Sequence, residues 1–189
     1  MEKQVFVTNA VTESRPYLAP GTYGRMDAGD VEGVGTLRWI GNKLYRWVQN
    51  RHSAALAAGD VVFHTFSDGA DAEKYVRDGA TADLGFMAGV VASTAIAVGT
   101  SDESYADGGY GWVQVLGYCA AANVLPDTNA TPAAGATLYG VDGQVYVNGQ
   151  AVTAMGTAPI YLKNLMLLEA VTMDTYATVT TAKVLVSCL

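Results

Sequence analysis

Short runs of apolar and β-branched residues, separated by Gly, Pro, Asn and Asp, recur along this chain. The clearest run is residues 110–118 (YGWVQVLGY), which follows a pair of glycines. This composition predicts a β-strand entered through a tight turn, with successive side chains on opposite faces. We therefore expect Trp112, Gln114 and Leu116 on one face and the two intervening valines on the other. The single Gln favours a partly exposed position, although a polar contact across an interface also fits.

A second pattern predicts a β-hairpin. Residues 36–40 and 43–48 flank a Gly-Asn pair, which suits a two-residue type II′ turn. Both faces of the hairpin carry large side chains. The pattern therefore leaves open whether Trp39 and Trp47 lie in the core or on a contact surface. The expected register places Leu37 opposite Arg46, Arg38 opposite Tyr45, and Trp39 opposite Leu44.

The remaining runs favour further strands, with one exception at residues 71–76, where one or two helical turns are expected. These patterns predict a mainly β chain, with an antiparallel β-sandwich or barrel-like domain over residues 34–189. The sequence patterns of the two halves are weakly similar, which indicates either two similar β-units or a chance similarity in an Ala-rich chain. These units would span about 34–125 and 126–189. Further strands are expected at 61–66, within 84–98 (one or two), at 137–141 and 144–147 around an Asp-Gly turn, and within 160–171 and 177–189.

The N-terminal segment, residues 1–33, has no sustained hydrophobic period and is interrupted by Pro and Gly. Pro and Gly at this density oppose a helix or a central strand, so we expect an extended arm. Tyr17 and Tyr23 favour an arm that is pinned to a neighbouring subunit, because aromatic side chains contribute large contact areas at interfaces. The first residues are polar, and no apolar stretch follows them that would indicate a signal peptide.

The composition narrows the possible partners. Half of the residues are hydrophobic, only 15% are charged, and the net charge is −7. An acidic chain without a strong basic cluster is not expected to bind nucleic acid, and no uncharged stretch is apolar enough to predict a membrane span. The low charge suits a protein that packs against others, or a compact Ala- and Gly-rich domain. Cys119 and Cys188 are too few for a disulfide framework and are expected to be buried free thiols.

Residues suited to catalysis are scarce. His52 and His64 lack the spacing of a metal site, and no Gly-x-Ser-x-Gly motif is present. The Gly-rich stretches lead into strands, whereas phosphate-binding loops lead into helices. The acidic clusters do not match a calcium-binding loop. We therefore predict no catalytic residue, no metal site and no cofactor, and we do not expect an enzyme.

Three stretches together resemble a known family. They are the strand at 110–117 (YGWVQVLG), the hairpin with the Ala-Gly-Asp-Val-Val segment at 58–62, and the closing Ala-Lys-Val-Leu-Val at 182–186. Over about residues 33–189 the chain resembles the decoration (cement) proteins of tailed-bacteriophage capsids. The resemblance implies a virion protein, made in the host cytoplasm, that binds the outside of the shell and stabilises it. It implies the major capsid protein and further copies of this chain, commonly as a trimer, as partners, and no catalytic residues.

Two alternatives remain at this point. One is another virion component, such as a tail or fibre subunit. The other is a carbohydrate-binding β-module, in which exposed tryptophans form a stacking platform. The candidate contacts with the capsid or between subunits are Tyr17, Tyr23, Arg38, Trp39, Tyr45 and Trp47.

Overall fold

The structure is a computed structural model, and the predicted mainly β fold is confirmed. It describes residues 10–17, 29–64, 74–77, 87–98, 108–124, 133–141, 144–147, 160–171 and 180–188. The strands are β1 (Ser14–Arg15), β2 (Leu37–Ile40), β3 (Lys43–Asn50), β4 (Leu56–Ala57), β5 (Val61–His64), β6 (Tyr75–Arg77), β7 (Met87–Val91), β8 (Ala95–Ile96), β9 (Tyr110–Val124), β10 (Thr137–Val141), β11 (Gln144–Val147), β12 (Ile160–Leu167) and β13 (Thr180–Ser187).

Strand β9 organises the whole sheet. Its first half pairs with β3 on one edge, and with β1 and then β7 on the other. From β7 the ladder continues through β5 and β6 back to β3, which closes a ring of five strands. The sheet thus closes on itself, and the barrel-like prediction is confirmed. The β3–β6 pair is parallel, in contrast to the expected antiparallel arrangement.

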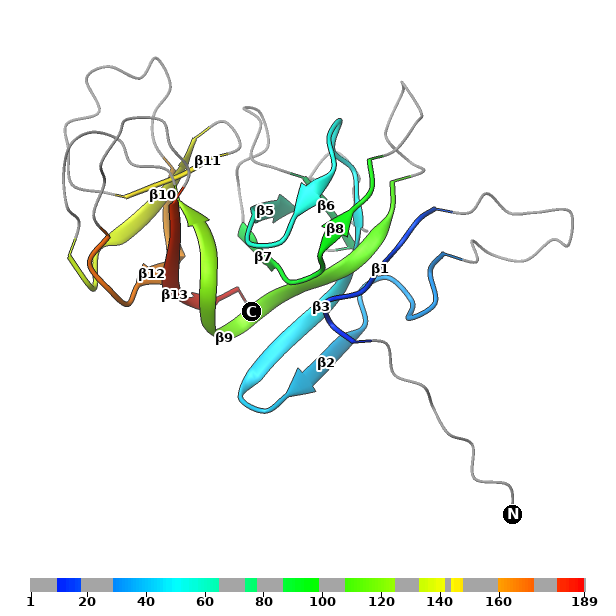
Figure 1. Cartoon of the computed structure of the whole chain (residues 1–189), viewed down its shortest axis with the longest axis horizontal. Helices are drawn as coiled ribbons and strands as arrows, with labels where there is room; N and C mark the ends of the chain where they lie inside the picture. The colour runs from blue at the N-terminus through cyan, green and yellow to red at the C-terminus, as the bar shows by residue number, and fades with distance from the viewer. Residues whose placement is uncertain are drawn as a thin grey trace, which may run out of the picture.

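The second half of β9 belongs to a different group of strands. It pairs with β13, and the order continues through β12 and β10 to β11. Figure 1 shows β9 curving out of the β3–β7 region and ending beside β13. The described strands of the segments 34–125 and 126–189 therefore share one sheet through β9.

A β-bulge in β9 explains one wrong prediction. Tyr45 lies opposite Gln114, but Leu44, the residue before Tyr45 in β3, lies opposite Leu116. Val115 is therefore an extra residue in β9, and an extra residue breaks the alternation of faces. Leu116 packs with Val115 against the main core, not beside Trp112 as strict alternation predicted.

Just beyond the bulge, β9 bends at Gly117. Gly117 has φ of +98°, and a Cβ atom there would lie 2.7 Å from the carbonyl oxygen of Asn42 in the β2–β3 turn. Only glycine combines this backbone conformation with so close an approach. The bend of β9 is thus packed directly against the hairpin turn.

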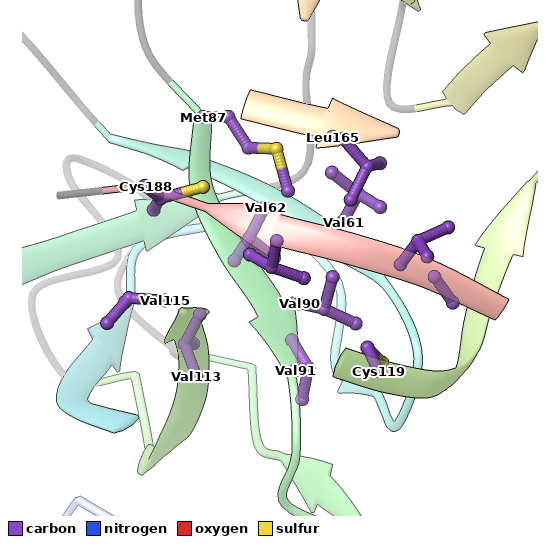
Figure 2. Close-up of a cluster of buried hydrophobic side chains, with 14 of the residues drawn as sticks. Val61, Val62, Met87, Val90, Val91, Val113, Val115, Cys119, Leu165 and Cys188 are labelled. Carbon is purple, nitrogen blue, oxygen red and sulfur yellow. The ribbon is translucent and has the colours of Figure 1, made fainter. Parts of the chain in front are cut away.

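Two separate clusters of buried side chains hold the fold together. The main core contains Val113 and Val115, which share a face as the alternation predicted, and joins both groups of strands. Figure 2 shows it, with Val61 of β5 and Leu165 of β12 among the contributing side chains. On the other face of β9, Trp112 belongs to a smaller aromatic cluster. Cys119 and Cys188 are both buried and free, as predicted.

The predicted hairpin is confirmed residue by residue. Strands β2 and β3 pair with Trp39 opposite Leu44 and Arg38 opposite Tyr45. Gly41 has φ of +60°, as the first position of a primed turn requires. The expected pairing of 137–141 with 144–147 is also confirmed, with Val141 opposite Gln144.

Two other expectations change. Helical turns were predicted for residues 71–76, but this prediction is wrong for residues 75 and 76. These two residues belong to β6 (Tyr75–Arg77), which pairs with β3 and β5 and completes the ring. Residues 71–73 lie outside the described part of the chain. Within the predicted arm, β1 pairs with Gly111 and Tyr110 of its own chain. None of the described segments forms a helix long and apolar enough to cross a membrane.

Candidate contact surfaces

The aromatic cluster contains two of the predicted contact residues, and both are unavailable to a partner. It consists of Tyr45, Trp47, Tyr110 and Trp112. The rings of Trp47 and Trp112 lie 5.2 Å apart between centroids, and Trp47 is completely buried. Trp47 Nε1 donates to Asp30 Oδ1 at 2.8 Å, which satisfies its only polar group. Trp47 and Tyr45 are therefore internal packing residues, and the prediction that they face a partner is corrected.

The remaining predicted contacts lie in different environments. Tyr17 is half-buried against the aromatic cluster of its own chain. Arg38 forms an ion pair with Glu32 at 2.8 Å, and its guanidinium lies 4.4 Å from the centroid of the Trp112 ring. Both interactions hold this side chain against the chain itself. Tyr23 lies outside the described residues.

Trp39 is the predicted contact residue that the structure leaves open to solvent, with 61% of its surface exposed. Its neighbours on β2, Leu37 and Ile40, are also exposed. β2 is an outer strand of the sheet: β3 lies on one side of it, and no other described strand lies on the other. We call Leu37, Trp39 and Ile40 the β2 edge patch.

A second apolar surface was not predicted from the sequence. Tyr118 of β9 lies opposite Leu185 of β13, and Leu185 lies opposite Met166 of β12. All three side chains are exposed, as is Leu168, which follows β12. We call these four residues the sheet-face row.

The sequence did contain a signal for this row. Leu185 stands between two buried valines, and Met166 stands between two buried leucines. Three consecutive apolar residues in a strand must place the middle one on the face opposite its neighbours. In a strand whose outer residues fill the core, the middle residue therefore points to solvent.

Few charges border the sheet-face row. Lys183 Nζ lies 2.6 Å from Glu169 Oε2. This hydrogen bond lowers the pKa of the Glu169 carboxyl and raises the pKa of the Lys183 ammonium. Lys43 Nζ lies 5.5 Å from the centroid of the Tyr118 ring, at the β9 end of the row. The row is thus apolar, with a neutralised ion pair on one flank and a lysine at one end.

The two cysteine thiols are buried. Burial raises the pKa of the Cys119 thiol, and it raises the pKa of the Cys188 thiol to about 12. A protonated thiol is a poor nucleophile and a poor metal ligand. His64 Nε2 lies 3.5 Å from Arg46 Nη1. Within the ranges that the structure describes, no three His, Cys, Asp or Glu side chains gather into a metal site.

No protein-family model and no curated protein matches this sequence. The two exposed apolar surfaces are therefore the features from which a function can be argued.

Proposed function

We propose that this chain is a structural protein of a phage virion that binds the outside of the capsid and stabilises the shell. The observation that carries the proposal is the presence of two exposed apolar surfaces, the β2 edge patch and the sheet-face row, on one β-scaffold. A protein that strengthens a shell by attachment must hold more than one neighbour. Two contact surfaces on one β-scaffold meet that requirement.

The sheet-face row is the surface we assign to the shell. Its four side chains leave 37–46% of their surface exposed. At about 150–250 Å² for a large side chain, this amounts to roughly 300 Å². Patches of about 300–600 Å² on a monomer often serve binding. The nearby Lys43 adds an electrostatic preference for a capsid surface that offers a carboxylate beside its apolar groups.

Low overall charge supports the same role. Only 15% of the residues are charged, and interface cores are depleted in charged residues. We further propose that the chain works as a homo-oligomer, a trimer on the shell as the family resemblance implies, with the major capsid protein as its partner. Repeated copies on a symmetric shell gain affinity because each attached chain holds the others close to their sites.

The proposal is tested by co-sedimentation with expanded phage shells that lack their decoration protein. The wild-type chain should pellet with the shells at micromolar concentration. Leu185→Lys places a charge in the centre of the row and should weaken binding by at least about tenfold. Thr181→Lys, which changes an exposed residue farther along the same strand, should bind like the wild type. If the wild-type chain stays in the supernatant with intact shells, the capsid role is wrong.

A carbohydrate-binding module is the second candidate, and the exposed Trp39 ring is the observation that favours it. Titration with a panel of glycans while tryptophan fluorescence is recorded tests this function. Trp47 and Trp112 are fully buried, so a glycan-dependent change in fluorescence should come from Trp39 and disappear in Trp39→Phe.

A tail or fibre location would instead appear as label at the tail in electron micrographs of labelled particles.

A further inference from the structure

We propose that the open edge of β2 binds a second copy of this chain by antiparallel strand pairing. In the β2–β3 hairpin, Ile40 pairs with Lys43 next to the two-residue turn. Hydrogen-bonded and non-hydrogen-bonded pairs alternate from there. Arg38 and Ile40 therefore direct their backbone groups toward β3, while Leu37 and Trp39 direct theirs toward the open edge. The bond from Trp47 N to Thr36 O, at 2.9 Å, continues this alternation.

The outward groups of β2 are complementary to themselves. When two β2 strands pair antiparallel with Arg38 at the twofold axis, Leu37 of one copy lies opposite Trp39 of the other. This register forms two hydrogen-bonded pairs, so the outward N–H and C=O groups of Leu37 and Trp39 all gain partners. The exposed side chains of Leu37 and Trp39 also become neighbours across the strands. The contact is isologous, which is the arrangement of a closed twofold dimer.

No charge on β2 protects this edge. Soluble proteins often keep an open strand from pairing by placing Lys, Pro or an unpaired charge on it. The one charged residue of β2 is Arg38, whose guanidinium is held by Glu32 at 2.8 Å and stacks on Trp112. In the paired register two such neutralised ion pairs meet at the axis. The electrostatic penalty that usually blocks edge pairing is therefore reduced.

The area predicts the strength of the contact. Leu37, Trp39 and Ile40 leave 45–61% of their surface exposed, which is roughly 300 Å² per chain for side chains of about 150–250 Å². Even complete burial of this area in both copies would remove at most about 600 Å² of side-chain surface from solvent, less than the ~1,200 Å² of a stable interface. We therefore expect reversible pairing at micromolar concentration. On a shell, this contact would join neighbouring oligomers at high local concentration.

Sedimentation equilibrium of the isolated chain from about 1 to 100 µM tests the proposal, since this range spans weak association. The average mass of the wild type should rise with concentration. Trp39→Lys, and Leu37→Pro, which removes an outward N–H, should each lower the association constant at least about tenfold. Leu185→Lys, the matched change on the sheet-face row, should leave association unchanged. A mass independent of concentration, or normal association of Trp39→Lys, would overturn the proposal.

A cysteine crosslink tests the register. Opposing residues of a non-hydrogen-bonded pair have Cα atoms about 4.5 Å apart, within the range of a disulfide. Arg38→Cys should therefore form covalent dimers under mild oxidation, and Leu185→Cys, an exposed control, should not. Crosslinking at Trp39→Cys but not at Arg38→Cys would contradict this register. Because Leu185→Lys affects shell binding and Trp39→Lys affects self-association, failure of either proposal can be distinguished from failure of the other.

Discussion

The side-chain Nε2 of Gln114 lies 3.0 Å from the carbonyl oxygen of Gly117, and this bond caps the bend of β9 from within the same strand. The same amide also donates to the carbonyl oxygens of Tyr118, at 3.0 Å, and Leu116, at 3.3 Å. Gln114 is buried, with 4% of its surface exposed. The partly exposed position expected from the sequence is therefore wrong, and Gln114, the one polar residue among the apolar residues 112–116, has an internal role.

Replacing Gln114 should destabilise the fold. Gln114→Leu keeps the approximate volume but removes the donor from the buried bend, which should cost about 1–3 kcal/mol of unfolding free energy. Urea denaturation followed by far-UV circular dichroism measures the change. Thr181→Val, an exposed polar-to-apolar change on β13, is the control and should stay within about 0.5 kcal/mol of the wild type. If Gln114→Leu is as stable as Thr181→Val, then Gln114 does not stabilise the bend of β9.

Gly117→Ala should be more costly than Gly41→Ala. Both glycines have positive φ, so both substitutions strain the backbone by about 1–2 kcal/mol. A Cβ at Gly117 also lies 2.7 Å from the Asn42 carbonyl oxygen, whereas a Cβ at Gly41 has no atom within 4 Å. The difference in unfolding free energy should therefore exceed about 1 kcal/mol. A similar loss in both variants would mean that the bend of β9 can move away from the hairpin.

Ser93 should hold the β1 segment on the barrel. Its Oγ accepts from the N–H of Trp112 at 2.7 Å and donates to the carbonyl oxygen of Glu13 at 2.6 Å. Ser93→Ala leaves the buried Trp112 N–H without this acceptor and should cost about 1–3 kcal/mol. Amides of residues 10–15 should then exchange with deuterium faster, as measured by mass spectrometry. Ser53→Ala, at an exposed position, should leave exchange unchanged, and unchanged exchange in Ser93→Ala would contradict the anchoring role.

Stability should fall as the pH rises above about 9. Burial raises the pKa of Cys188 from its ordinary value of 9.0 to about 12, so the unfolded chain loses this proton first. The unfolding free energy therefore decreases from about pH 9 to about pH 12, and its full value is present below pH 9. Denaturation at several pH values should show this slope, and Cys188→Ala should reduce it. A smaller slope of the same sign should remain, because burial also raises the pKa of the Cys119 thiol and of the Tyr45 hydroxyl.

The same burial predicts how the thiols react. In the native chain at about pH 8, both cysteines should resist a thiol reagent, and both should react once guanidinium chloride unfolds the chain. Rapid modification of Cys188 in the native state would contradict its burial and would remove the cause of the pH slope.

The candidate surfaces show which contact residues could be predicted from the sequence alone. Trp39 and Trp47 are both tryptophans of one hairpin, and the hairpin itself was predicted correctly. Trp39 and Trp47 lie on opposite faces of the hairpin, and β9 pairs with β3 and brings Trp112 against Trp47. No described strand pairs with the outer edge of β2. Neighbouring strands come from distant parts of the chain, so no local pattern reveals which tryptophan is covered. The sheet-face row was missed although triplets such as Val184–Val186 pointed to it.

What the sequence determined by itself are the local features: the strand at β9, the hairpin and its register, and the buried cysteines. Side-chain alternation, and a turn whose conformation two residues set, act over a few residues and need no other part of the chain. Only the tertiary structure decided the bulge at Val115, the burial of Gln114 and the strand conformation of β6. The bulge and the strand conformation of β6 depend on pairing with distant strands, and the burial of Gln114 depends on the bend that brings three carbonyl oxygens of its own strand to its side chain. The exposed surfaces on which function is proposed follow from that long-range pairing, because a strand's partners decide which of its faces and edges remain open.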